Sequence, residues 1–302
     1  MTQEIEAFRP FGTVLTAMVT PMTDDGAIDY ASMGRLAKHL LANGYDALVV
    51  SGTTGESPTT HAPEKIELIG AVRGAVGKDV TIVAGAGSND TAHAIRMAEQ
   101  AAQAGADGLL SVVPYYSKPS QRGVIAHFEA IADATDLPIM VYDIPGRCGI
   151  KLAPSTLDAL GQIDTIVAIK DATGNVEAAA KSMERTGLAY YCGDDALNLE
   201  FIRAGASGVV SVAAHVVGST IARMISAHNA GDDAAAAAAH EEAMPVIEAL
   251  MGTGLGAVTA KAAMQALGVI PTRAMRLPHV PLDDDEYAAL CDALRASGAR
   301  VK

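Results

Sequence analysis

The sequence is organised as a regular alternation of strand and helix patterns. Short apolar runs rich in β-branched residues recur at intervals of roughly 25 to 30 residues, and a helical pattern follows each run, which is typical of βα units on a parallel sheet. Eight such runs are present, at residues 14–20, 47–51, 80–85, 108–114, 138–143, 165–170, 189–193 and 208–213. Eight repeats without a break in composition favour a closed (β/α)8 TIM barrel over an open doubly wound sheet.

Local patterns support the barrel and indicate where it ends. The strand runs are almost entirely apolar, as expected for strands that are covered on both faces. Asp29 and Gly44 bracket one helical pattern, and Pro63 stands in the first turn of the next. Strand patterns stop near residue 216. We therefore predict a barrel over residues 1–230 and a C-terminal helical subdomain, packed on the barrel, over residues 231–302.

Composition and charge argue against several classes of protein. The formal net charge of −13 and the pI of about 5.0 do not suit a sequence-independent nucleic-acid binder, which needs a basic face. Cys148, Cys192 and Cys291 are widely spaced and odd in number, which fits a reducing cytosol better than a disulfide framework. The sequence shows neither a secretory signal pattern nor an apolar run suited to a membrane span. We expect a cytoplasmic protein that binds neither nucleic acids nor membranes.

Lys170 is the sharpest candidate for chemistry. Active sites of (β/α)8 barrels lie at the carboxyl ends of the strands, and Lys170 ends the sixth strand run. Its amine should therefore point into the barrel, where burial disfavours the charged form and leaves a nucleophile that can attack a carbonyl group. A lysine that only caps the strand and pairs with Asp171 is equally compatible with this position.

Three further strand ends carry polar groups that suit the same chemistry. Tyr142 could donate and retake a proton, although a packing tyrosine is a common alternative. Thr53 and Thr54 lie in a glycine-flanked turn whose hydroxyl and N–H groups could hold a small carboxylate. Arg147 offers bidentate binding of a second carboxylate, or is simply a surface arginine. Taken together, these groups indicate a site for a keto acid.

Five separated motifs give the chain a family resemblance. They are GTTGES at 52–57, VPYYSKPSQRG at 113–123, YDIPGR at 142–147, IKDATGN at 169–175 and GDDALNL at 193–199. From about Gly12 to its end the chain resembles the dihydrodipicolinate synthases, which are pyruvate-dependent class I aldolases, and it is most similar to actinobacterial members. The resemblance implies condensation of pyruvate with L-aspartate-4-semialdehyde, without a metal or organic cofactor.

The resemblance also implies a role for each candidate residue. Lys170 would form the Schiff base with pyruvate, while Tyr142 moves protons in a relay with Thr53. Tyr116 would complete that relay from a neighbouring subunit of a homotetramer built as a dimer of dimers. The remaining members of the substrate site would be Thr54 and the backbone of Val210, which hold the pyruvate carboxylate, Gly193 beside them, and Arg147, which binds the carboxylate of the second substrate.

The chain departs from the family pattern in three places. Members inhibited by lysine line a pocket between subunits with His and Glu residues, whereas Ala62, Lys65 and His93 stand at the matching positions here. A cation at Lys65 should repel the ammonium group of a lysine ligand, so we expect weak or absent feedback by lysine. Asp143 replaces a common Asn, and residues 252–261 lack a common Asn-Pro.

Two other functions are compatible with parts of the pattern. N-acetylneuraminate lyase and 2-keto-3-deoxygluconate aldolase are similar pyruvate aldolases, but Arg147 favours a small acidic acceptor over a sugar acid. A non-catalytic barrel that senses a keto acid is the alternative from a different class. The combination of Lys170, Tyr142, Thr53 and Tyr116 argues against a sensor, because a sensor needs no proton relay.

Overall fold

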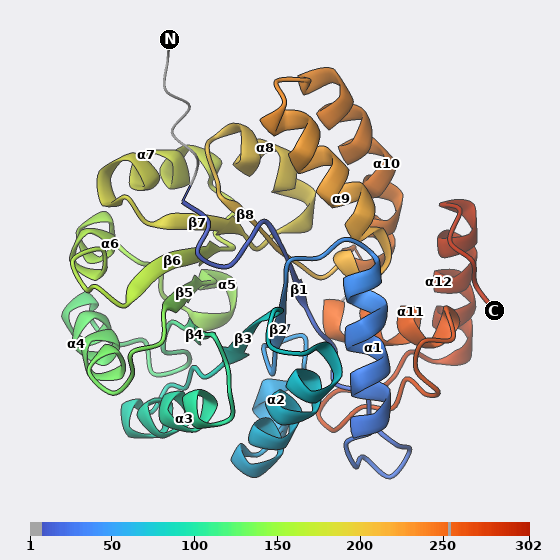
Figure 1. Cartoon of the computed structure of the whole chain (residues 1–302), viewed down its shortest axis with the longest axis horizontal. Coiled ribbons are helices and arrows are strands. Elements are labelled where there is room, and N and C mark those ends of the chain that lie inside the picture. Colours follow the sequence, from blue (N-terminus) through green and yellow to red (C-terminus); the bar gives the residue numbers. More distant parts are fainter. Residues whose placement is uncertain (1–7, 253–254) are drawn as a thin grey trace.

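A computed structural model, which describes residues 8–252 and 255–302, forms a closed barrel of eight parallel strands (Figure 1). Each strand pairs with its sequence neighbours, and β1 closes the barrel against β8. The strands are β1 (Val14–Ala17), β2 (Ala47–Val50), β3 (Thr81–Gly85), β4 (Gly108–Val112), β5 (Ile139–Asp143), β6 (Ile166–Asp171), β7 (Ala189–Cys192) and β8 (Gly208–Ser211). The predicted (β/α)8 barrel is confirmed.

Helices surround the barrel in the order that the sequence alternation requires (Figure 1). They are α1 (Tyr30–Ala42), α2 (Ala62–Val76), α3 (Thr91–Gln103), α4 (Gln121–Ala132), α5 (Pro145–Cys148), α6 (Pro154–Leu160), α7 (Val176–Thr186), α8 (Asn198–Arg203) and α9 (Ala214–Asn229). The expected caps are present: the Asp29 carboxylate accepts a hydrogen bond from the backbone N–H of Ser32 at 2.9 Å, and Pro63 lies in the first turn of α2.

The first and the last strand end before the apolar runs that predicted them. The first run reaches residue 20, but β1 ends at Ala17, and beyond it the N–H of Val19 donates to Nε2 of His215 in α9. The last run reaches residue 213, but β8 ends at Ser211, where the next N–H groups donate to Asp195 instead of to a strand. Apolar residues continue past each strand because the loops above the barrel are also buried.

Alternation of side chains divides every strand between two cores. The inward residues form a lumen core, and the outward residues pack against the helices. Phe11 fills the amino-terminal end of the lumen: its N–H donates to the hydroxyl of Tyr191 at 3.2 Å, and that hydroxyl donates to the carbonyl of Gly12 at 3.0 Å. The lumen is therefore filled from below, and inward polar residues can meet only at its carboxyl end.

Three more helices follow α9: α10 (Asp233–Met251), α11 (Gly256–Ala266) and α12 (Asp284–Ala296). They share an apolar core that includes Val246 of α10, Ala263 of α11 and Leu294 of α12. Ala213, which follows β8, belongs to the same core. Helix α10 packs along α9 (Figure 1). The division between residues 1–230 and 231–302 stays a prediction.

None of the helices within residues 8–252 and 255–302 is both long and apolar enough to span a bilayer by itself. Helices α10 and α11 pass a length and composition test only as a pair, with a bend of 110° between them.

Candidate active site

The strand register brings Lys170 and Tyr142 together at the carboxyl end of the lumen. Tyr142 on β5 and Lys170 on β6 are register partners, and each is 5% exposed. The Nζ of Lys170 lies 4.2 Å from the centroid of the Tyr142 ring. Side chains of a barrel strand point alternately into the lumen and toward the helices. The inward side chains near the ends of β5 and β6 are Tyr142 and Lys170, which therefore meet.

Burial sets the chemistry of the lysine. Burial and, to a smaller extent, the positive charge of Arg147 lower the pKa of Lys170 to about 8, while Asp195 acts in the opposite sense. Roughly one amine in ten is then neutral at pH 7. The alternative is that Lys170 pairs with Asp171 or with another carboxylate, but no ion pair of Lys170 is present among residues 8–252 and 255–302.

The phenol of Tyr142 is poised to remain protonated. Burial raises its pKa to about 12, although the charge of Arg147 counteracts part of that rise. Thr53 lines the same cavity as Tyr142 and lies in the turn that follows β2. No hydrogen bond joins Tyr142 to Thr53 among the contacts of the described residues.

A cavity of about 400 Å³ opens above these residues. Of the candidate residues, Thr53, Tyr142 and Arg147 line it. Lys170 lies behind this lining, against the ring of Tyr142, and Thr54, Gly193 and Val210 are also outside it. The cavity is thus bounded by Tyr142, against whose ring the amine of Lys170 lies.

The residues around Lys170 leave room for its side chain. A Cβ atom at Gly193, which follows β7, would lie 3.0 Å from Cε of Lys170, so a larger residue would crowd the amine. Val210 lies on β8 and is 2% exposed, and Thr54 is 8% exposed in the turn after β2. That turn is closed by hydrogen bonds from the N–H of Gly55 to Gly52 and from the N–H of Glu56 to Thr53.

Tyr116 differs from the other candidates. It is 88% exposed and lies outside the cavity lining, with a left-handed backbone at φ +69°, whereas the neighbouring Tyr115 does line the cavity. A non-glycine residue in this conformation is uncommon. The single chain does not bring Tyr116 to Lys170.

Arg147 lies on the short helix α5 at the mouth of the cavity, and its side chain is exposed. Its guanidinium is close enough to lower the pKa of both Lys170 and Tyr142. An arginine in this place can bind a carboxylate that enters the cavity.

Asp195 lies close to Lys170, and sequence reasoning did not single it out. It is 3% exposed, and its Oδ2 accepts hydrogen bonds from the N–H groups of Val212 at 2.9 Å and Ala213 at 2.8 Å. It thereby fixes the chain just after β8 and supplies a negative charge near Lys170. Its place after a strand end, in GDDALNL, was the available signal.

The described residues contain no cluster of three or more His, Cys, Asp or Glu side chains that could hold a metal ion. All three cysteines are free and buried.

Residues 10–297 match the model of the dihydrodipicolinate synthetase family. The chain belongs to this family. It is a lyase of the class I aldolase type. The 4-hydroxy-tetrahydrodipicolinate synthases of Bifidobacterium longum and Mycolicibacterium paratuberculosis are each 48% identical to it, over 96% and 95% of this chain and 95% of each relative. The resemblance predicted from the motifs, including that to actinobacterial members, is confirmed.

Solved structures of the family have the same fold. The enzyme of Cyanidioschyzon merolae with lysine bound has a TM-score of 0.93 against this chain at 42% identity. The match covers 97% of this chain and 100% of that enzyme. The chloride-inhibited Acinetobacter baumannii enzyme complexed with pyruvate has a TM-score of 0.92 at 33% identity, over 96% and 100%.

A pair of buried carboxyl groups lies on the outer face of the same strand ends. Asp143 and Asp171 are register partners on β5 and β6, and they are 3% and 5% exposed. One oxygen of Asp143 has no hydrogen-bond partner. Burial, and then the neighbouring Asp171, raise the pKa of Asp143 to about 7, against a weaker opposing effect of Lys151.

We predict that Asp143→Asn stabilises the protein at pH 8 by on the order of 1–3 kcal/mol. The pKa of the Asp143 carboxyl is about 7 in the folded state and ordinarily 3.8. The free energy of unfolding of the wild type should therefore fall as the pH rises from about 3.8 through about 7. Urea unfolding at pH 4, 6 and 8 measures the difference, which should vanish at pH 4. The exposed Asp164→Asn is the control, and equal stability of wild type and Asp143→Asn at pH 8 would contradict the prediction.

Proposed function

We propose that this protein condenses pyruvate with L-aspartate-4-semialdehyde to form 4-hydroxy-tetrahydrodipicolinate, in the diaminopimelate route to lysine. The observation that carries the proposal is the buried amine of Lys170 against the ring of Tyr142 at the carboxyl end of the barrel. Relatives at 48% identity that bear the name of this synthase, and a family structure complexed with pyruvate, support the choice of substrates.

The reaction begins when the neutral amine of Lys170 attacks the keto carbon of pyruvate. Loss of water from the carbinolamine gives a protonated imine, which acts as an electron sink. The imine loses a methyl proton and becomes an enamine, whose carbon attacks the aldehyde. Attack of the substrate's own amino group on the imine carbon then releases Lys170 and closes the ring. The lysine supplies the electrophile, so we expect no metal or organic cofactor.

Tyr142 is suited to move the protons. Its raised pKa keeps the phenol protonated at neutral pH, so it can donate to the departing hydroxyl of the carbinolamine. A phenolate at this position is costly, and partners that return the proton are therefore needed. We propose Thr53, which lines the same cavity, and Tyr116 from a neighbouring copy as those partners. The exposure of Tyr116 in the single chain supports this assignment.

The two carboxylates have separate proposed sites. The turn with Thr54 and the backbone of Val210, with Gly193 leaving space beside them, would hold the pyruvate carboxylate below the amine. Arg147 at the mouth of the cavity would bind the carboxylate of the semialdehyde. Its charge also lowers the pKa of Lys170, so one side chain serves both binding and activation.

We further propose a homotetramer built as a dimer of dimers, with Tyr116 shared across the tighter dimer, and a cytoplasmic location. The exposed Tyr116 supports an assembly, and three free, buried cysteines suit a reducing compartment.

Borohydride reduction in the presence of pyruvate should attach a pyruvate-derived group to Lys170, detectable by peptide mass spectrometry. The rate of labelling at limiting pyruvate should rise with pH, reach half of its maximum near pH 8 and level off above about pH 9, because only the neutral amine attacks. Lys170→Ala should give no adduct and lose synthase activity by a factor on the order of a thousand or more. A keto-acid sensor would give no adduct in the wild type.

Arg147→Ala should raise the KM for aspartate-semialdehyde by on the order of 10- to 100-fold, since a charged hydrogen-bond partner is lost. The KM for pyruvate should change much less. Steady-state assays with each substrate varied in turn measure both values. Unchanged kinetics with the semialdehyde would favour a sugar-acid aldolase, for which this arginine has no role.

The lining of the cavity includes the cationic side chain of Lys65, and none of the described residues that line the cavity carries a carboxylate. Lys65, His61 and His93 line it, and the Nζ of Lys65 donates to Oγ of Ser57 at 3.0 Å. Burial lowers the pKa of Lys65 to about 8, so it is still mostly charged at pH 7. A ligand with an ammonium group would be repelled there, which supports the proposal of weak or absent lysine feedback.

We expect L-lysine to leave synthase activity unchanged at low-millimolar concentrations at pH 7. Activity at fixed pyruvate and semialdehyde, measured over a lysine series, checks this. Lys65→Met removes the repelling charge and is the matched variant, in which any residual inhibition should strengthen. An inhibition constant in the low-millimolar range or below in the wild type contradicts the expectation.

A further inference from the structure

A buried ion pair joins the turn after β2 to the C-terminal helices. The Nζ of Lys261 in α11 donates to Oε1 of Glu56, and both side chains are fully buried. Of the ion pairs within residues 8–252 and 255–302, this is the only one with both partners at 0% exposure. The two residues are 205 positions apart in the sequence.

The C-terminal segment engages both oxygens of this carboxylate. The second oxygen of Glu56 accepts a hydrogen bond from the backbone N–H of Arg276 at 3.1 Å. Lys261 donates its other hydrogen bond to the carbonyl of Ala274 at 2.9 Å. Glu56 is thus held by α11 and by the extended chain that follows it, and within the described residues its carboxylate accepts no hydrogen bond from its own turn.

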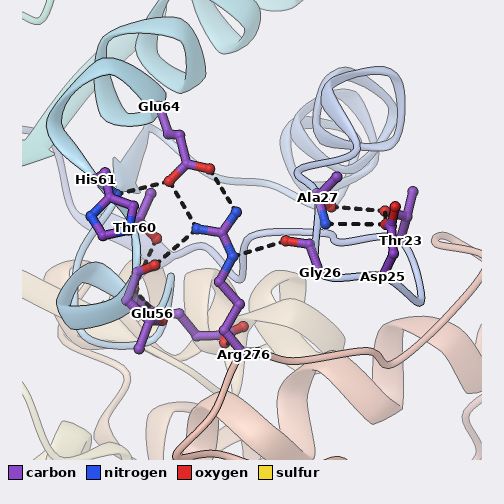
Figure 2. Close-up of polar contacts among 10 residues, drawn as sticks. Thr23, Asp25, Gly26, Ala27, Glu56, Thr60, His61, Glu64 and Arg276 are labelled. Carbon is purple, nitrogen blue, oxygen red and sulfur yellow. Dashed lines mark hydrogen bonds and ion pairs between the residues drawn. The ribbon is translucent and has the colours of Figure 1, made fainter.

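The side chain of Arg276, in the segment between α11 and α12, makes a second set of contacts with the barrel (Figure 2). Its guanidinium donates to both oxygens of Glu64 at 2.8 and 2.6 Å and to the carbonyls of Thr59 at 2.8 Å and Gly26 at 2.8 Å. The segment between α11 and α12 therefore binds the region after β2 at two points, which are Glu56 and the pair of Thr59 and Glu64.

Glu56 needs this support because of its backbone. Its φ is +58°, in the left-handed region that residues other than glycine rarely adopt. Its N–H donates to the carbonyl of Thr53 at 3.1 Å, and its carbonyl accepts a hydrogen bond from Oγ1 of Thr60 at 2.8 Å. The conformation of Glu56 thus closes the turn that contains Thr53 and Thr54.

A buried ion pair is weak ground for a role in stability alone, since apolar residues of similar size often serve as well. Its directional contacts are better suited to fixing one geometry. We infer that Lys261 and Glu56 are positioning residues, which hold the Thr53–Thr54 turn where it can bind the carboxylate of the keto acid. This inference rests on the proposed function, because it assumes that pyruvate binds beside that turn.

The inference predicts a change in pyruvate binding from a substitution in α11. Lys261→Met leaves the carboxylate of Glu56 buried without its partner, so the turn should shift until that group finds water or a proton. A misplaced carboxylate site weakens binding but leaves the amine of Lys170 intact. The pyruvate concentration that gives half-maximal borohydride labelling of Lys170 should therefore rise by about tenfold or more, with full labelling restored at saturation.

Arg203→Met is the matched control. Its ion pair with Asp233 also joins the barrel to α10, at 2.7 Å, but it is exposed and lies away from the turn. This control should leave the half-saturating pyruvate concentration within about twofold of wild type. Circular dichroism and thermal melts of every variant set the assay temperature below its unfolding transition.

Two further variants keep the inference open to disproof if Lys261→Met does not fold. Glu56→Gln preserves the shape of the side chain, and Glu56→Gln combined with Lys261→Met removes both buried charges. Each should also raise the half-saturating pyruvate concentration. The inference is overturned if the folded variants show the wild-type value, or if labelling at saturation falls only in proportion to unfolded protein. Absence of label in the wild type would instead overturn the proposed function itself.

Discussion

The site depends on one constraint, which is the burial of a lysine amine in the filled lumen of a barrel. Lys170 is 5% exposed and lies against the ring of Tyr142, so its charged form is disfavoured and its pKa falls to about 8. The barrel supports this because Phe11 and Tyr191 close the opposite end of the lumen. A lysine in a wetter position would remain fully protonated near neutral pH and would be a poor nucleophile.

The electrostatics of the cavity are opposite to those of the chain. The protein carries a formal net charge of −13, yet Lys65 and Arg147 line the cavity and none of the described residues that line it carries a carboxylate. Such a cavity attracts small carboxylates. Arg147 has two electrostatic effects, because it can bind a carboxylate and it also destabilises the ammonium form of Lys170.

None of the described residues of the C-terminal helices lines the cavity. These helices and the segment between them instead bind Glu56 in the turn beside it. Lys261 and Arg276 reach the turn after β2 from residues that follow the barrel by more than one helix. Asp195 has a comparable place on the opposite side, where it holds the backbone after β8. In both places a buried carboxylate accepts directional hydrogen bonds from a distant segment of the chain.

The sequence by itself determined the eightfold alternation, the caps at Asp29 and Pro63, and the strand ends that carry Lys170 and Tyr142, because these follow from local periodicity and from the rule that barrel sites lie at strand ends. Family motifs added the roles proposed for Thr53 and Arg147. Only the tertiary structure decided that Lys261 pairs with Glu56, that Asp143 faces Asp171, and that Lys170 lies behind the cavity lining. Those relations depend on register and on contacts between distant segments, which no local pattern encodes.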